Sequence, residues 1–217
     1  MAETYISARK RLEVLPQIFT GSDLTVRFQW PSPIASSYLA QWRKAGLVKS
    51  LGGRSDIHMN LVVNREPNLD LALARLYPRA IRIGIDVLRE CGWTTQIPSS
   101  VDVAIPREYV KHGIDGYILS TRSEKWYASI APGLERAPGG LDALKPAWAF
   151  ADMMDRASDR RVRDSWLPDP EDLDMEGIME SKDLTAAMTA FGLSAASYET
   201  FYEEWFEAHY ERARPKS

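Results

Sequence analysis

The chain has 217 residues, of which 45% are hydrophobic and 26% are charged, and its formal net charge at pH 7 is −3. This composition is typical of globular proteins and excludes an intrinsically disordered or fibrous chain. No run of about 18 apolar residues occurs, so we expect no transmembrane span. The first residues also lack the basic and then apolar pattern of a secretory signal, which favours a cytoplasmic protein without a membrane partner.

Cysteine and histidine are too sparse for a metal site. The single cysteine, Cys91, excludes an internal disulfide and a thiolate-rich zinc site. The three histidines, His58, His112 and His209, lie far apart and have no ligand-like spacing. We therefore expect no metal and no cofactor.

Charge is distributed unevenly along the chain. Residues 1–66 carry nine Lys and Arg against five Asp and Glu, a net charge of +4, so the remainder carries −7. A basic segment beside an acidic one is one indication of nucleic-acid binding, although a solvated basic face gives the same count.

The basic segment predicts three helices. Apolar residues at helical spacing predict a helix over residues 4–15, which Pro16 ends. A second helix begins near Thr20 or Ser22, whose hydroxyl can accept a hydrogen bond from the first free amides, and it runs through Phe28. After the turn Pro31-Ser32-Pro33, a third helix is expected over residues 34–45.

The third helix has a clear inner and outer side. Ala35, Leu39 and Trp42 recur at i, i+4 and i+7 and predict a buried stripe. The opposite side is small and polar near its N-terminus, so it can approach base edges and phosphates.

Two short strands complete this segment. The apolar runs at 47–51 and 57–61 flank Gly52-Gly53-Arg54-Ser55-Asp56 and predict a hairpin with Arg54 at its tip. Three helices followed by a hairpin are the order of a winged helix-turn-helix, where a wing arginine can contact a phosphate or a minor groove. A protein-interaction module of the same fold is the alternative. The polar linker 63–68 then divides the chain into domains 1–66 and 67–217.

The second domain is predicted to place helices on a small, mostly antiparallel sheet, which makes the chain α+β. A strand over residues 101–105 is expected beside a hairpin formed by 117–121 and 126–131. The expected helices cover 69–76, 78–92, 141–156, 182–191 and 197–212.

No catalytic motif is present, so we expect no enzyme. Gly139-Gly140 is not followed by the Lys-Ser/Thr of a phosphate loop, and Asp174 stands where a calcium loop over 169–177 needs glycine. The acids of residues 169–183 form either a solvated surface or a docking surface for a basic partner.

Two further patterns leave alternatives open. Arg156, Arg160, Arg161 and Arg163 either pair with neighbouring aspartates or bind a phosphate-rich ligand. The aromatic stripe over residues 198–209 either docks on its own domain or forms a partner surface.

Several segments resemble AbiEi-type antitoxins of type IV (abortive infection, phage-defence) toxin–antitoxin systems. Residues 19–24 (Phe-Thr-Gly-Ser-Asp-Leu) and 38–48 are similar to their N-terminal winged helix. Residues 72–81, 92–106, 146–152 and 166–173 are similar to their antitoxin domain. Where family members often carry His-Gly, this chain has Cys91-Gly92, so a role of that histidine does not transfer.

The resemblance implies an antitoxin that is also a transcriptional autorepressor. The winged helix would bind inverted repeats in double-stranded operator DNA at its own promoter, and the C-terminal domain would counteract a cognate AbiEii-type nucleotidyltransferase toxin. Two basic residues, Arg43 and Lys49, are expected to contact phosphates. The remaining DNA-binding residues are those that match the recognition helix (Ser32, Ser36, Ser37, Gln41 and Lys44) and the wing (Arg54 and Ser55).

Two other functions are considered beside this one. Some relatives are thought to modify the toxin enzymatically, for example by phosphorylation, but this chain has no nucleotide-binding motif. A transcriptional regulator whose C-terminal domain senses a ligand, without a toxin partner, is the second.

Overall fold

The computed structural model describes residues 7–52, 54–137, 140–157, 168 and 170–193. Contacts divide the chain into two units. The first comprises Met1–Arg79, Val110–Asp115 and Pro138–Leu141, and the second comprises Ala80–Tyr109, Gly116–Ala137 and Asp142–Ser217. Within the described residues, no helix has the length and apolar character needed to cross a membrane.

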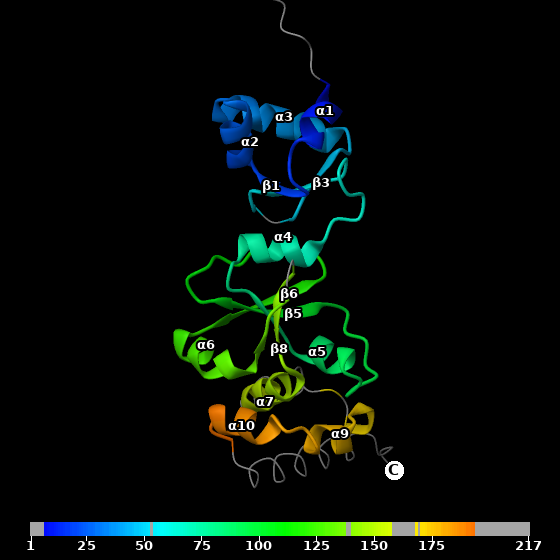
Figure 1. The fold of residues 1–217 in the computed structure, drawn as a ribbon, viewed down its shortest axis with the longest axis vertical. Helices are drawn as coiled ribbons and strands as arrows, with labels where there is room; N and C mark the ends of the chain where they lie inside the picture. The colour runs from blue at the N-terminus through cyan, green and yellow to red at the C-terminus, as the bar shows by residue number, and fades with distance from the viewer. Residues whose placement is uncertain (1–6, 53, 138–139, 158–167, 169, 194–217) are drawn as a thin grey trace, which may run out of the picture. The chain divides into compact units, whose positions relative to one another are not determined.

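The described residues of the first unit form four helices and a small antiparallel sheet (Figure 1). The strand order is β1-β3-β2, so the predicted hairpin is confirmed as β2 and β3. The expected boundary after residue 66 precedes α4, which the contacts group with the first unit. The elements are α1 (Ala8–Glu13), β1 (Ile18–Thr20), α2 (Gly21–Phe28), α3 (Ser32–Lys44), β2 (Val48–Ser50), β3 (Ile57–Asn60) and α4 (Leu69–Leu76).

Local sequence explains most of these boundaries. Thr20 and Asp23 form a capping box at the start of α2, in which each side chain accepts a hydrogen bond from the other's backbone N–H. The short strand β1 was not predicted because three residues between a proline turn and a helix cap show no alternation. The first helix is shorter than expected, since α1 begins after Ser7, and residues 1–6 lie outside the described residues.

Two polar side chains connect the elements of the first unit. Asn60 is fully buried, and its Nδ2 donates to the carbonyl oxygen of Leu12 at 2.7 Å, at the end of α1. Arg75 of α4 donates to the carbonyl oxygen of Ile18 at 3.1 Å and pairs with Asp23 at 2.7 Å. Helices α1 and α4 are thus both joined to the sheet region by hydrogen bonds.

The second unit is built on a mixed five-stranded sheet of order β6-β5-β4-β8-β7. The α+β class is therefore confirmed, whereas the expected mostly antiparallel pairing is wrong: β5–β6 and β4–β8 are parallel, and β4–β5 and β7–β8 are antiparallel. Its elements are β4 (Ile81–Ile83), α5 (Ile85–Glu90), β5 (Val101–Pro106), β6 (Tyr117–Arg122), α6 (Glu124–Ile130), η1 (Ala131–Gly133), β7 (Leu134–Glu135), β8 (Asp142–Leu144), α7 (Pro146–Ala157), η2 (Pro170–Asp172), α9 (Met175–Met179) and α10 (Leu184–Ala190).

Three predictions for this unit are corrected. The helix expected over 78–92 is the strand β4 followed by α5, because Gly84 at φ 80° interrupts it. The second strand of the expected hairpin, 126–131, is instead largely the helix α6, whose start is capped by the Ser123 hydroxyl and which buries Tyr127 and Ile130. The helix expected from residue 141 begins at Pro146, after the strand β8.

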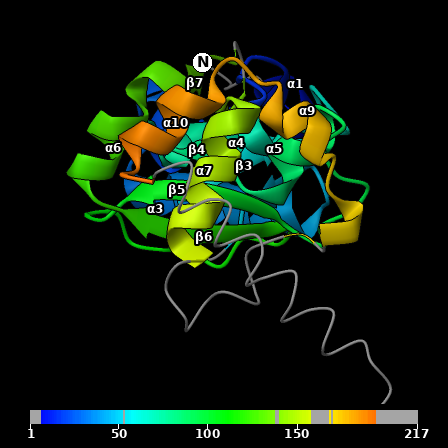
Figure 2. The same cartoon turned by 90° about the horizontal axis from the view of Figure 1, so that it is seen from below.

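Helix α7 is the central element of the second core. It packs between the sheet and the short helices α9 and α10, as Figures 1 and 2 show. Its buried side chains include Trp148, Phe150, Met153 and Met154. The helix expected over 182–191 is confirmed as α10, and the one expected over 197–212, with its aromatic stripe, lies outside the described residues.

Part of the acidic segment is used inside the second unit. Asp172 accepts hydrogen bonds from Thr95 at 3.3 Å and from Gln96 at 3.1 Å. Asp174 caps the start of α9 by accepting from the N–H of Gly177, and Asp183 pairs with Lys145 at 3.4 Å. These acids therefore stabilise local structure in addition to carrying charge.

Candidate nucleic-acid interface

Helix α3 turns one polar side outward. Ala35, Leu39 and Trp42 are buried against the first core, as their spacing predicts. The helix contains no acidic residue and carries Arg43 and Lys44 in its last turn. The exposed residues predicted to contact DNA on this helix are Ser32, Ser36, Ser37, Gln41, Arg43 and Lys44.

The predicted contact residues are spread around half of the helix. Successive residues of an α-helix are about 100° apart, so Ser37 and Gln41 lie on one flank and Ser36 and Arg43 on the other. Ser37 and Gln41 line a groove, whereas Arg43 is close enough to the sheet for its charge to act on His58. The structure thus brings together Ser37 and Gln41 and separates them from Arg43.

The groove has a volume of about 580 Å³, and aromatic rings form part of it. Phe28 stacks on Trp30 at a centroid distance of 4.6 Å, and Trp30 stacks on Tyr38 at 4.4 Å. The guanidinium of Arg11 lies 4.8 Å from the Tyr38 ring centroid and 5.2 Å from that of Trp30. Sequence patterns did not predict this arrangement, because its residues come from α1, the last turn of α2, the turn after it and α3.

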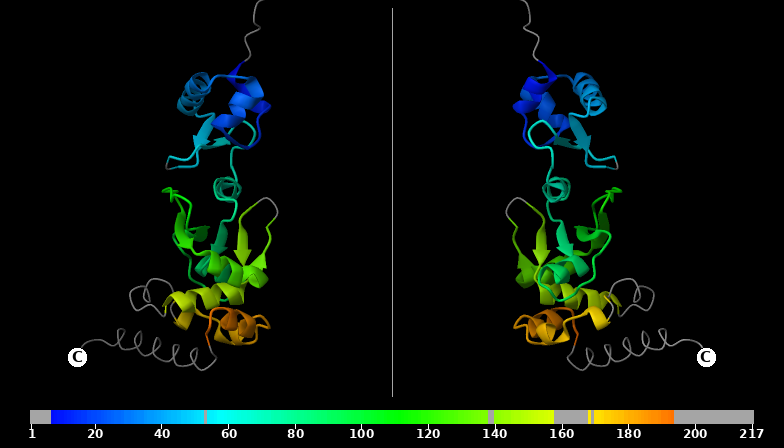
Figure 3. Two further views of the ribbon diagram at one scale, coloured as in Figure 1. Left: turned by 90° about the vertical axis from the view of Figure 1, so that its left-hand side faces the viewer. Right: turned by 90° about the vertical axis from the view of Figure 1, so that its right-hand side faces the viewer.

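The β2–β3 loop lies on the same side of the first unit as α3 (Figure 3). Arg54 in this loop and Lys49 on β2 are both exposed. Ser55 is half-buried, and its hydroxyl donates to the carbonyl oxygen of Gly52 at 2.9 Å, so it stabilises the turn. Gly52 has φ 126°, and a Cβ there would lie 3.2 Å from the carbonyl oxygen of Gly113.

A carboxylate joins this loop to the start of α2. Asp56 accepts from the N–H of Gly21 at 3.0 Å, and its other oxygen lies 3.3 Å from Nε2 of His58. Burial lowers the pKa of His58, Asp56 opposes that effect, and the charge of Arg43 lowers the pKa further. His58 is therefore a buried, mainly neutral imidazole beside the loop.

The second unit contains a separate cluster of buried charges. Asp152 is 1% exposed; it pairs with Arg122 at 3.1 Å and accepts from Nε1 of Trp126 at 2.7 Å. The Arg122 guanidinium also lies 5.2 Å from the centroid of the Trp126 ring. These contacts hold α6 and α7 against the end of β6.

Asp102 belongs to the same cluster, but its carboxylate has fewer hydrogen-bond partners than that of Asp152. Its buried Oδ1 has no hydrogen-bond partner among the described residues. Burial raises the pKa of Asp102 to about 6, although Arg156 and Arg122 oppose the shift. Burial also lowers the pKa of Arg156 to about 10. Arg160, Arg161 and Arg163, predicted to group with Arg156, lie outside the described residues.

Sequence patterns did not reveal this cluster. Alternation over residues 101–105 predicts one buried face, but Val103, Ala104 and Ile105 are all buried, so both faces of β5 are covered. Among the residues that the structure describes, no group of three or more His, Cys, Asp or Glu side chains could hold a metal ion.

A solved structure with a similar fold is the RV2827C protein from Mycobacterium tuberculosis. The two chains superpose with a TM-score of 0.56 and 17% sequence identity, over 92% of this chain and 73% of that one. No protein-family model matches the sequence. No curated protein matches it either. At this identity the similarity shows the fold alone.

The first prediction from this geometry concerns His58. Because its folded-state pKa is lowered, the unfolded chain binds the proton more readily below pH 6.5. The stability of the first unit should therefore be intact above pH 6.5 and fall as the pH drops through the folded-state pKa. Urea unfolding between about pH 7.5 and about pH 5 should show this loss, and His58→Gln should reduce it. His112→Gln is the control, and an equal effect of both variants would contradict the assignment.

The second prediction concerns Asp102. A raised folded-state pKa stabilises the fold below pH 3.8, and this contribution is lost as the pH rises through about 6. Asp102→Asn should therefore raise the unfolding free energy at neutral pH, by about 1–2 kcal/mol after allowing for partial solvent screening. The exposed Asp115→Asn variant is the control. A loss of stability at neutral pH in Asp102→Asn would show that ionised Asp102 is needed.

Proposed function

We propose that the first unit is a winged helix-turn-helix that binds double-stranded operator DNA. The observation that carries the proposal is the outer side of α3, which is polar, free of acidic residues and flanked by basic side chains. The order of the elements before α4, in which α1, α2 and α3 precede the β2–β3 hairpin, supports the same interpretation. The exposed Arg54 of the β2–β3 loop supplies a wing contact.

The second part of the proposal is that the chain represses its own operon and acts as an antitoxin. The resemblance of residues 72–81, 92–106 and 146–152 to the AbiEi antitoxin domain supports this role. The partner is then a nucleotidyltransferase toxin, encoded by a gene next to the gene of this protein. The net charge of −7 on residues 67–217, which contain the whole second unit, disfavours DNA as the ligand of this part of the chain.

DNA binding can be tested with duplexes from the region upstream of the gene. Fluorescence anisotropy of the full chain at about 50 and about 200 mM salt should show binding that weakens steeply with salt. Arg54→Ala should weaken binding severalfold to operator and scrambled duplex alike, because a phosphate contact is independent of sequence. Gln41→Ala should instead reduce the difference between the two duplexes, by about tenfold, because an amide reads base edges.

The control for these variants is Arg65→Ala, which removes an exposed arginine of the linker. Binding of Arg54→Ala and Gln41→Ala that matches the wild type on both duplexes would show that α3 and the wing are not the interface. An absence of binding by the wild type at low salt would overturn the DNA-binding proposal itself.

The antitoxin role predicts a separable activity. Expression of the neighbouring toxin gene should arrest growth, and co-expression of the full chain from an unrelated promoter should restore it. The Arg54→Ala variant should restore growth as well as the wild type, because toxin antagonism is assigned to the second unit. Failure of the wild type to restore growth would contradict the antitoxin role while leaving DNA binding intact.

A further inference from the structure

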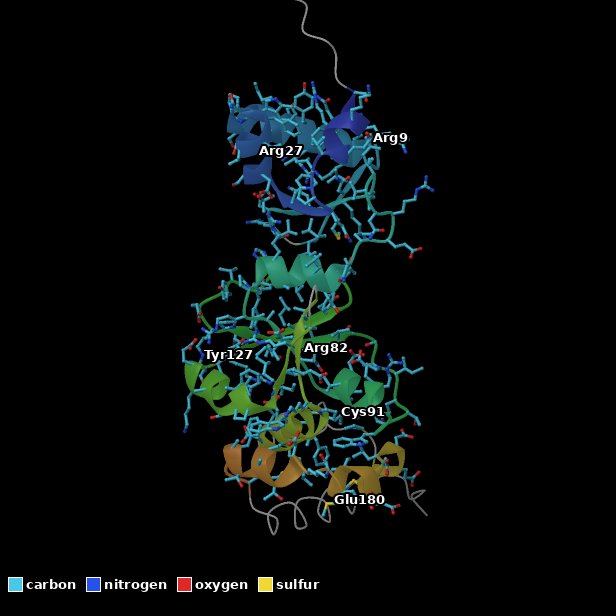
Figure 4. The ribbon with its side chains drawn as sticks, viewed as in Figure 1. Arg9, Arg27, Arg82, Cys91, Tyr127 and Glu180 are labelled. Carbon is cyan, nitrogen blue, oxygen red and sulfur yellow. The ribbon has the colours of Figure 1, made fainter. Side chains whose placement is uncertain are left out.

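Arg11 differs from the other basic side chains of α1 in what surrounds it. It is half-buried in the groove beside α3, with its guanidinium over the rings of Tyr38 and Trp30. Neighbouring Arg9 is 72% exposed and pairs with Glu13 at 3.7 Å, and Figure 4 shows it at the outer edge of the first unit. Glu13, the acidic residue of α1, thus pairs with Arg9.

The edge of the Arg11 guanidinium is open in the described part of the chain. There, no carboxylate pairs with it and no acceptor hydrogen-bonds to it. Cation–π contact holds a guanidinium through its face, so the N–H donors at its edge stay available for an acceptor. The stacked series Phe28, Trp30 and Tyr38 fixes the plane against which it rests.

The groove around Arg11 fits an anion. Among the described residues that line it, which include Tyr38 and Trp42, Arg11 is the only charged one. The same groove contains Ser37 and Gln41 of the proposed recognition helix. A planar guanidinium that is already oriented is well suited to bidentate contact with a phosphate.

We propose that Arg11 clamps a phosphodiester group of the DNA strand that passes along the groove beside α3. This inference rests on the proposed DNA-binding function and adds a contact from α1 to it. The clamp sets the position of the recognition helix on the duplex, so that Ser37 and Gln41 face the neighbouring bases. It carries no sequence preference of its own, because every nucleotide has the same phosphate.

The test compares Arg11→Gln with Arg9→Gln, a matched change two residues away on the same helix. Both full-length variants are titrated against fluorescein-labelled operator and scrambled duplexes over a series of salt concentrations. Arg11→Gln should weaken binding to both duplexes by about tenfold and reduce the magnitude of the salt slope by about one. Arg9→Gln should leave both quantities close to those of the wild type.

A second readout separates a phosphate contact from a purely structural role. The wild type should lose about tenfold in affinity when one operator phosphate near the contact is replaced by an uncharged methylphosphonate. Arg11→Gln should be insensitive to that same replacement, whereas a destabilised but otherwise intact interface would remain sensitive. Arg11→Lys, which keeps the charge without the planar stack, should retain the salt slope.

The outcomes separate a failure of the Arg11 clamp from a failure of the proposed DNA-binding function. If the wild type does not bind DNA at low salt, the proposed function fails, and the clamp with it. If the wild type binds and Arg11→Gln keeps both the salt slope and the sensitivity to methylphosphonate, only the clamp is overturned. The clamp is also overturned if free inorganic phosphate binds in the groove while Arg11→Gln binds DNA as tightly as the wild type does.

Discussion

The burial of Trp42 constrains everything that we propose for the first unit. This side chain is 2% exposed and packs with Leu39 and Ala35 in the core. Because helical geometry fixes the angle between successive residues, burying this stripe determines which side chains of α3 reach solvent. The stacking of Trp30 on Tyr38 holds the turn before α3. The Tyr38 ring also contacts the Trp42 ring, at a centroid distance of 5.8 Å. One packed cluster thus sets both the direction of α3 and the groove beside it.

The second unit depends on how its buried charges are compensated. Asp152 receives an ion pair and an indole hydrogen bond, so its burial is well balanced. Among the described residues, Oδ1 of Asp102 has no hydrogen-bond partner, and a Cβ on Gly84 would lie 2.9 Å from its Oδ2. A neutral carboxyl group is therefore favoured there over most of the acidic range. In the sheet, Asp102 of β5 lies opposite Ile83 of β4.

The two units divide the proposed function according to charge. Nucleic-acid binding is assigned to the basic segment, in which α3 has no acid and the exposed Lys49 and Arg54 extend the positive surface. Toxin antagonism is assigned to the acidic remainder, where Asp172 and Asp174 stabilise local turns and still contribute negative charge. Such a division keeps the second ligand from competing with DNA for the same surface.

The sequence by itself determined the elements whose signals are local: the capped start of α2, the inner stripe of α3, the β2–β3 hairpin and the strand β5. It also identified every exposed polar residue of α3 as a contact candidate. Tertiary structure decided the rest. Residues 126–130 form a helix because Ser123 caps it and the core accepts Tyr127, although their composition favours a strand. The parallel pairs and the buried state of Asp102 depend on which strands become neighbours, and Arg11 reaches the groove only because α1 packs beside α3. These are contacts between distant segments, which local periodicity does not encode.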